Sequence, residues 1–108
     1  MAGKGLSEMT GIADRLMDAW GDYIVALRSN EGFKEDLYDR LVSVLRDCAP
    51  EWRDAEAIPK LAVNVLVDIV SVSQAVAESY SEPVRQRVYE ASFELYDLIV
   101  ECVGAAPS

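Results

Sequence analysis

The segment LAVNVLVDIVSVSQAVA, residues 61–77, decides between a membrane-spanning fold and a water-soluble one. A membrane-spanning helix needs about 20 predominantly apolar residues, and polar side chains are rare within it. This segment has only 17 residues and contains Asn64, Asp68 and Gln74. We therefore expect a buried helix of a soluble bundle, and no membrane partner.

Turn and capping residues divide the whole chain into four helices. A turn at Ser29–Gly32 follows the first helix, and Pro50 is expected to end the second, because the residue before a proline avoids the helical region. Pro59 fits the first turn of the third helix, and Gly104 ends the fourth. Short connections predict a single all-α domain, an antiparallel four-helix bundle. The domain covers residues 1–108, with helices at about 7–28, 33–48, 58–80 and 82–103.

The third and fourth helices carry more apolar surface than a bundle helix needs. At 100° per residue, apolar side chains cover roughly 240° of the third helix and roughly 220° of the fourth, whereas about 100° is enough for a one-faced helix. Twofold dimers are the commonest soluble assemblies, so we expect a homodimer packed through these two helices. A different protein or an apolar ligand between the helices is the alternative. The expected dimer seam consists of Tyr89, Phe93, Tyr96 and Val100.

Charge restricts the possible partners. Acidic residues outnumber basic ones by 19 to 10, which gives a formal net charge of −9, and the basic residues are scattered along the chain. This negative field repels phosphate backbones, so no nucleic-acid partner is expected. Acidity favours solubility and also suits a basic protein partner. The fourth helix is expected to show an acidic stripe to solvent, made of Glu90, Glu94, Asp97 and Glu101.

Standard catalytic groups are missing from the sequence. It contains no histidine, which removes the usual acid–base group near neutral pH and the commonest nitrogen ligand for metals. Lys4 stands between glycines but lacks the rest of a phosphate-binding loop. Cys48 and Cys102 have no CxxC spacing and are expected to be buried thiols. We therefore expect a protein that is not an enzyme and has no cofactor or metal.

Two short motifs favour a different function. Residues 36–42 are DLYDRLV and residues 94–100 are ELYDLIV, so Asp36 with Asp39 and Glu94 with Asp97 place carboxylates three residues apart. Such pairs on facing helices can hold Mg²⁺ together with substrate phosphates. The spacing resembles the acidic helix motifs of the all-α nucleoside triphosphate pyrophosphohydrolases, and this resemblance implies Mg²⁺-dependent nucleotide hydrolysis. The apolar periodicity turns both pairs toward solvent, away from any shared pocket.

Trp52 lies in PEWRDAEA, residues 50–57, a charged segment predicted to be a loop. A large indole there either covers the end of the bundle or stays exposed as an anchor for a partner. A lid over the core is the commoner use of such a tryptophan. The exposed anchor is the functional alternative, so Trp52 joins the interaction candidates.

The sequence as a whole predicts a helical protein–protein interaction module, regulatory or adaptor-like, with an acidic surface. A bundle that binds a small apolar or aromatic ligand is the alternative. The N-terminal segment MAGKGLSEMTG has no apolar stretch typical of a secretory signal, so a cytoplasmic, reducing location is expected.

Overall fold

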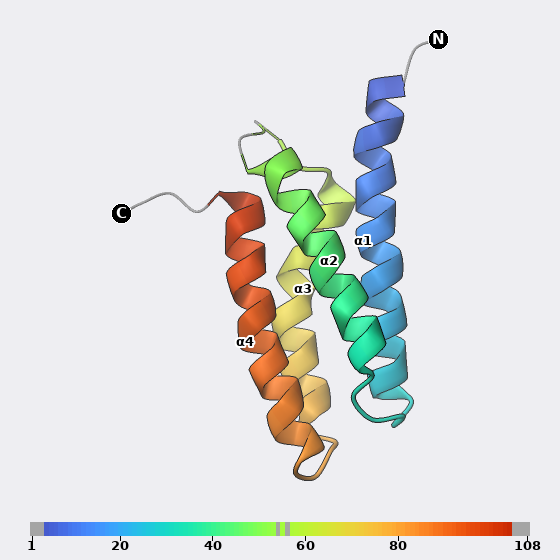
Figure 1. Ribbon diagram of the computed structural model, residues 1–108, viewed down its shortest axis with the longest axis vertical. Helices are drawn as coiled ribbons and strands as arrows, with labels where there is room; N and C mark the ends of the chain where they lie inside the picture. Colours follow the sequence, from blue (N-terminus) through green and yellow to red (C-terminus); the bar gives the residue numbers. More distant parts are fainter. Residues whose placement is uncertain (1–3, 54, 56, 105–108) are drawn as a thin grey trace.

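Four α-helices lie side by side in the computed structural model (Figure 1). It describes residues 4–53, 55 and 57–104, with side chains from residue 11 onward. The expected all-helical fold with four packed helices is confirmed. The helices are α1 (Lys4–Arg28), α2 (Glu35–Trp52), α3 (Lys60–Ala77) and α4 (Val84–Val103).

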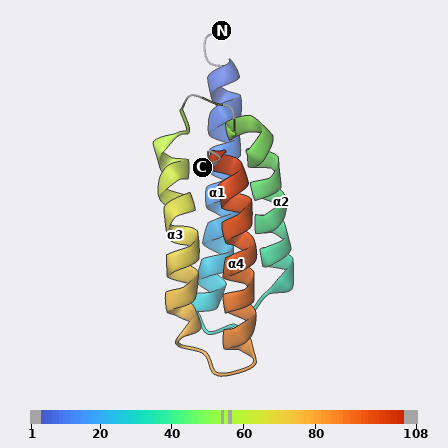
Figure 2. The ribbon, with the colours of Figure 1, turned by 90° about the vertical axis from the view of Figure 1, so that its left-hand side faces the viewer.

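The helices do not follow one another around the bundle. α1 and α4 each pack against both α2 and α3, so α1 and α4 lie on one diagonal, and α2 and α3 on the other. Consecutive helices run in opposite directions, which makes α1 parallel to its neighbour α3 and α2 parallel to its neighbour α4 (Figures 1 and 2). The predicted antiparallel packing is therefore correct for α1 with α2 and for α3 with α4, and wrong for the other two contacts. The seven residues 53–59 can span roughly 20 Å when extended, enough to cross the end of the bundle.

Tyr80, just beyond the end of α3, connects this helix to the turn between α1 and α2. Its hydroxyl donates a hydrogen bond to the Leu27 carbonyl at 2.7 Å and accepts one from the Gly32 amide at 3.1 Å. The turn uses left-handed backbone at Asn30, with φ 63°, and at Gly32, with φ 88°. Asparagine tolerates this conformation and glycine adopts it freely, so the predicted turn is confirmed.

α2 continues beyond Cys48, where the sequence predicted its end. Pro50 lies in the last turn, where it removes one backbone hydrogen bond, and the Arg53 amide still donates to the Ala49 carbonyl at 2.9 Å. The additional turn buries the Trp52 side chain, which is only 1% exposed. Burying a large side chain contributes about 2–3 kcal/mol, which offsets the lost bond. Trp52 is therefore a core residue, which confirms the predicted lid over the core, and the alternative of an exposed partner anchor is wrong.

The other helix ends differ from the predicted ones by a few residues. α1 begins at Lys4 and not at residue 7. α3 and α4 each begin two residues later than predicted, and α3 ends at Ala77. Gly104 ends α4 with φ 62°, as predicted.

The core draws buried side chains from all four helices. Cys48 of α2 and Cys102 of α4 are both buried and unbridged, as predicted. The Cys102 thiol donates a hydrogen bond to the Leu45 carbonyl at 3.3 Å. The largest fully buried aliphatic side chains include Leu16, Leu27, Leu41, Leu45, Ile69 and Leu95.

Among the described residues, α3 is long and apolar enough to cross a membrane by length and composition alone. The core helix of a soluble bundle passes the same test. In this structure α3 packs between α1 and α4 (Figure 2). Its buried residues are Ala62, Val65, Leu66, Ile69, Ser73 and Ala77.

Candidate interaction site

The outer face of α4 carries large apolar side chains that are not buried within the chain. Phe93 is 62% exposed and Tyr96 is 55% exposed, while Tyr89 and Val100 are half-buried. Val103, three residues after Val100, is also exposed and extends the row. The spacing along this row is four, three, four and three residues, which is the spacing of a coiled-coil seam. We call these five residues the outer row of α4.

A second row on α4 faces the core of the bundle. It follows the same alternation of three and four residues, so α4 has two apolar faces. Only the inner one is covered by α2 and α3, which leaves the outer row at the surface. The buried residues of α4 are Val88, Ala91, Ser92, Leu95 and Cys102.

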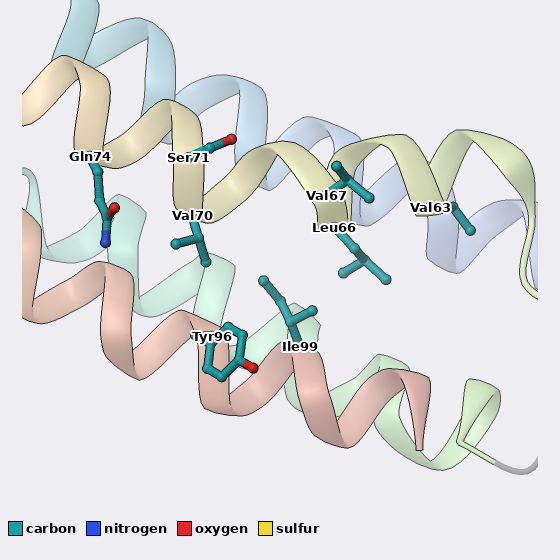
Figure 3. Close-up of a pocket in the computed structure, with 8 residues that line it drawn as sticks. All are labelled: Val63, Leu66, Val67, Val70, Ser71, Gln74, Tyr96 and Ile99. Atoms are coloured by element: carbon teal, nitrogen blue, oxygen red, sulfur yellow. The ribbon is translucent and has the colours of Figure 1, made fainter. Parts of the chain in front are cut away.

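The neighbouring face of α3 forms an apolar groove with α4. Figure 3 shows Leu66 and Val70 of α3 pointing toward Tyr96 and Ile99 of α4. Val67, at the edge of the groove, is 68% exposed. The groove has a volume of about 400 Å³. Its lining consists of Val63, Leu66, Val67, Val70, Ser71, Gln74, Tyr96 and Ile99.

Hydrogen bonds fix the register of α3 against α4 at one end of the groove. The Gln74 amide donates to Ser92 Oγ at 3.1 Å, and this hydroxyl donates to the Tyr89 carbonyl at 2.7 Å. The Tyr89 hydroxyl donates to the Glu78 carboxylate, and this bond raises the pKa of Tyr89. Gln74 therefore lies level with Ser92, and Glu78 lies level with Tyr89.

A second groove, of about 470 Å³, lies between α2 and α4 and has a polar lining. It contains three of the four carboxylates in the DLYD and ELYD motifs, those of Asp39, Glu94 and Asp97. All four carboxylates are exposed, as predicted, but the prediction that they share no pocket is wrong for these three, because α2 and α4 are direct neighbours. Asp36 is exposed and does not line the groove. The other lining residues are Tyr38, Val42, Arg46, Arg87 and Leu98.

Glu94 interacts with two side chains in this groove. The Tyr38 hydroxyl donates a hydrogen bond to its carboxylate, and Nη1 of Arg87 lies 3.7 Å from Oε1. Burial, together with this hydrogen bond, raises the pKa of Tyr38. In the part of the chain that the structure describes, no three histidine, cysteine, aspartate or glutamate side chains are grouped so that they could hold a metal ion. The Glu94 carboxylate is thus held by interactions within the chain.

The predicted acidic stripe of α4 is exposed but not uniform. Glu90 and Glu101 face solvent, and the Gln86 side chain lies 3.4 Å from the Glu90 carboxylate. Glu94 and Asp97 border α2. The stripe therefore has two solvent-facing ends and a middle section that belongs to the polar groove.

The sequence also contained signals that were not used to predict this site. Val63, Val67 and Val70 repeat at intervals of four and three residues, and Gln74 follows after four more. This is the spacing of the outer row of α4, and it identifies the second wall of the apolar groove. Arg46 and Arg87 were missed in the polar groove because no local pattern shows that α2 and α4 are neighbours.

No protein-family model matches this chain, and comparisons with curated proteins and with solved structures found no match. The geometry of its own surfaces is therefore the basis for a functional proposal.

Proposed function

We propose that the protein is a non-enzymatic helical interaction module, regulatory or adaptor-like, that acts in the cytoplasm and self-associates through α3 and α4. The exposed outer row of α4 beside the apolar groove is the observation that carries this proposal. Contiguous exposed apolar surface marks interaction sites in soluble proteins. A second copy of the chain is the proposed cover, because twofold dimers are the commonest assemblies.

The molecular mass in solution, measured by light scattering, tests this self-association. Phe93→Glu places a charge in the middle of the outer row, so we expect a dimeric wild type and a monomeric variant with unchanged helical content. Val25→Glu is the matched control, because Val25 is 59% exposed but lies on α1. A monomeric wild type would contradict the proposal, as would a dimer that Val25→Glu splits and Phe93→Glu leaves intact.

Ionic strength distinguishes self-association from the binding of a basic protein. Two copies with a net charge of −9 each repel one another, so added salt should strengthen the dimer. The Debye length shrinks from about 10 Å at 0.1 M salt to about 3 Å at 1 M. A basic partner bound to the acidic stripe would be released over the same range. We propose the stripe, with its exposed ends at Glu90 and Glu101, as the second contact surface of the module.

The apolar groove also supports a second candidate function, the binding of a small apolar or aromatic ligand. Its volume lies within the range of about 300–1,000 Å³ that is typical of small-molecule sites. Nile red is a suitable probe. Saturable binding of one dye per monomeric wild-type chain, lost in Val67→Glu and retained in Val25→Glu, would favour this function over self-association. Equal dye binding by both variants would contradict the ligand-binding function.

In this module the DLYD and ELYD carboxylates are surface and ion-pairing groups. Glu94 already interacts with Tyr38 and Arg87, and Asp36 lies outside the polar groove. We therefore expect no release of pyrophosphate from nucleoside triphosphates in the presence of Mg²⁺. Release that is abolished by both Asp39→Asn and Glu94→Gln would establish the enzyme instead.

A further inference from the structure

We propose that Cys48 of α2 and Cys102 of α4 are a thiol modification site, a pair that forms a reversible disulfide when the protein meets a small disulfide oxidant such as glutathione disulfide. The site does not depend on the proposed self-association. The chain contains two cysteines, and the fold brings both to one place in the core.

Hydrogen bonds fix the level of α2 against α4, which run parallel to one another (Figures 1 and 2). The residues that they join are 52, 56 and 57 positions apart in the sequence: Glu35 with Arg87, Tyr38 with Glu94, and Leu45 with Cys102. Cys48 and Cys102 are 54 positions apart, which lies within this range. An α-helix rises about 1.5 Å per residue, so the two cysteines differ in level by less than about 5 Å.

The two side chains also point to the same place. Both are fully buried, and the Cys102 thiol donates a hydrogen bond to the Leu45 carbonyl at 3.3 Å. The side chain of a helical residue lies over the preceding turn, so Cys48 covers the turn that begins with Leu45. The two sulfur atoms are therefore neighbours. In agreement with this, the interaction with Cys102 raises the pKa of the Cys48 thiol, and the interaction with Cys48 lowers the pKa of the Cys102 thiol.

The alternative role for both cysteines is packing. A free cysteine often serves as a small, buried apolar residue. Packing alone does not require the two sulfur atoms to adjoin across two helices, whereas a disulfide does. The meeting of these two side chains is therefore the observation that favours the modification site.

Oxidation needs access to at least one sulfur atom. Cys102 lies one residue before the end of α4, and Cys48 lies four residues before the end of α2, at the same end of the bundle (Figure 1). Helix ends open locally at a low cost in free energy. The last turn of α4 can therefore expose Cys102 while the rest of the bundle stays folded.

The reaction consists of two thiol–disulfide exchanges. The Cys102 thiolate attacks one sulfur of glutathione disulfide, which forms a mixed disulfide and releases one glutathione thiolate. The Cys48 thiolate then attacks the Cys102 sulfur and releases the second glutathione thiolate. The protein loses two electrons and two protons, and glutathione disulfide becomes two molecules of glutathione.

Mass spectrometry of the folded wild-type protein, incubated at low concentration with glutathione disulfide, tests the site. We expect the intact single chain to lose two hydrogen atoms, and a digest without reductant to contain the Cys48 peptide linked to the Cys102 peptide. Dithiothreitol should restore both thiols. The bond closes a loop of 54 residues, so the melting temperature followed by circular dichroism should rise by roughly 10 °C. Cys48→Ala and Cys102→Ala are the matched controls, in which the oxidant should not raise the melting temperature.

The wild-type measurements decide the proposal even where an alanine variant fails to fold. Two thiols that stay free in the folded protein would overturn it, as would glutathione that remains attached to either cysteine or a disulfide between two chains. A bond that forms only in urea, or that lowers the melting temperature, would show that the folded helices do not allow it, and would also overturn the proposal.

Discussion

The guanidinium carbon of Arg87 lies 4.4 Å from the centroid of the Phe33 ring, so the first turn of α4 covers the segment that leads into α2. The same carbon lies 5.1 Å from the centroid of the Tyr38 ring. Arg87 also donates two hydrogen bonds to Glu35, at 3.1 and 3.2 Å, and these hydrogen bonds lower the pKa of the Glu35 carboxyl. One side chain therefore holds α4 to α2 through both rings and a carboxylate.

Replacement of Arg87 should destabilise the fold more than loss of an ordinary surface arginine. We expect Arg87→Ala to lower the free energy of unfolding by about 1 kcal/mol, because cation–π contacts and the packing of the side chain are lost together. Arg40→Ala is the control, since its ion pair with Asp22 is exposed and should be worth less than about 0.5 kcal/mol. Urea unfolding measures the free energy of unfolding of both variants, and an equal decrease in the two would contradict this role of Arg87.

Trp52 should behave as a core residue. Truncation of a buried tryptophan to alanine costs about 3–5 kcal/mol, so Trp52→Ala should unfold at a much lower temperature or fail to fold. Trp52→Phe is the milder variant, and Trp20→Phe on the half-buried face of α1 is the control. In the Trp20→Phe protein, Trp52 fluorescence should be blue-shifted until the chain unfolds. Red-shifted emission from the folded protein would contradict burial.

Replacing each of two glycines by alanine should change the stability of the fold in opposite directions. At Gly104 the backbone is left-handed, and a β-carbon would lie 2.5 Å from the Arg53 carbonyl oxygen, so Gly104→Ala should destabilise by at least about 1 kcal/mol. At Gly21, inside α1, a β-carbon meets nothing within 4 Å, so Gly21→Ala should stabilise by about 0.5–1 kcal/mol. Thermal unfolding of the two variants checks the signs, and a stabilising Gly104→Ala would rule out this cap geometry.

Stability should fall as the solution becomes alkaline. Burial raises the pKa of Tyr23, and burial together with the hydrogen bond to Glu94 raises the pKa of Tyr38. In the unfolded chain both tyrosines lose their protons near pH 10, roughly their ordinary value. The unfolded state then binds fewer protons than the folded one, and stability declines as pH rises through that range.

The contributions of the two buried tyrosines, Tyr23 and Tyr38, to this alkaline decline can be measured separately. The free energy of unfolding, obtained from urea titrations between pH 7 and about pH 11, should be level at first and then fall. Its slope should approach about 1.4 kcal/mol per pH unit for each group. Tyr23→Phe and Tyr38→Phe should each reduce the slope above about pH 10. A midpoint that does not change across the range would contradict these pKa directions.

Helix number, the first turn and the Gly104 cap could be predicted because each depends on neighbouring residues. Phe93 and Tyr96 of the expected dimer seam are exposed in the single chain, while the seam itself stays a prediction. The end of α2 was predicted wrongly, at Cys48, because Pro50 was expected to stop the helix. A local helix-breaking signal was overridden there by the burial of Trp52, a tertiary gain that local propensity cannot include.

Which helices are neighbours was not predictable from periodicity. An apolar stripe shows that a helix packs against something, but it does not show which helix is beside it. The diagonal placement of α2 and α3 therefore escaped prediction, and with it the groove that brings Asp39 to Glu94. Arg87 was missed for the same reason, because its hydrogen-bond partner Glu35 in α2 lies 52 residues away in sequence.

Residues 53–59 connect α2 to α3 across the end of the bundle. This short link joins two hairpins, α1 with α2 and α3 with α4. The helix–helix contacts between the hairpins are side-by-side contacts of parallel helices, α1 with α3 and α2 with α4. Neither hairpin can bury its inner residues alone. A chain cleaved within this link would therefore behave as a split protein, whose two fragments fold only when they recombine.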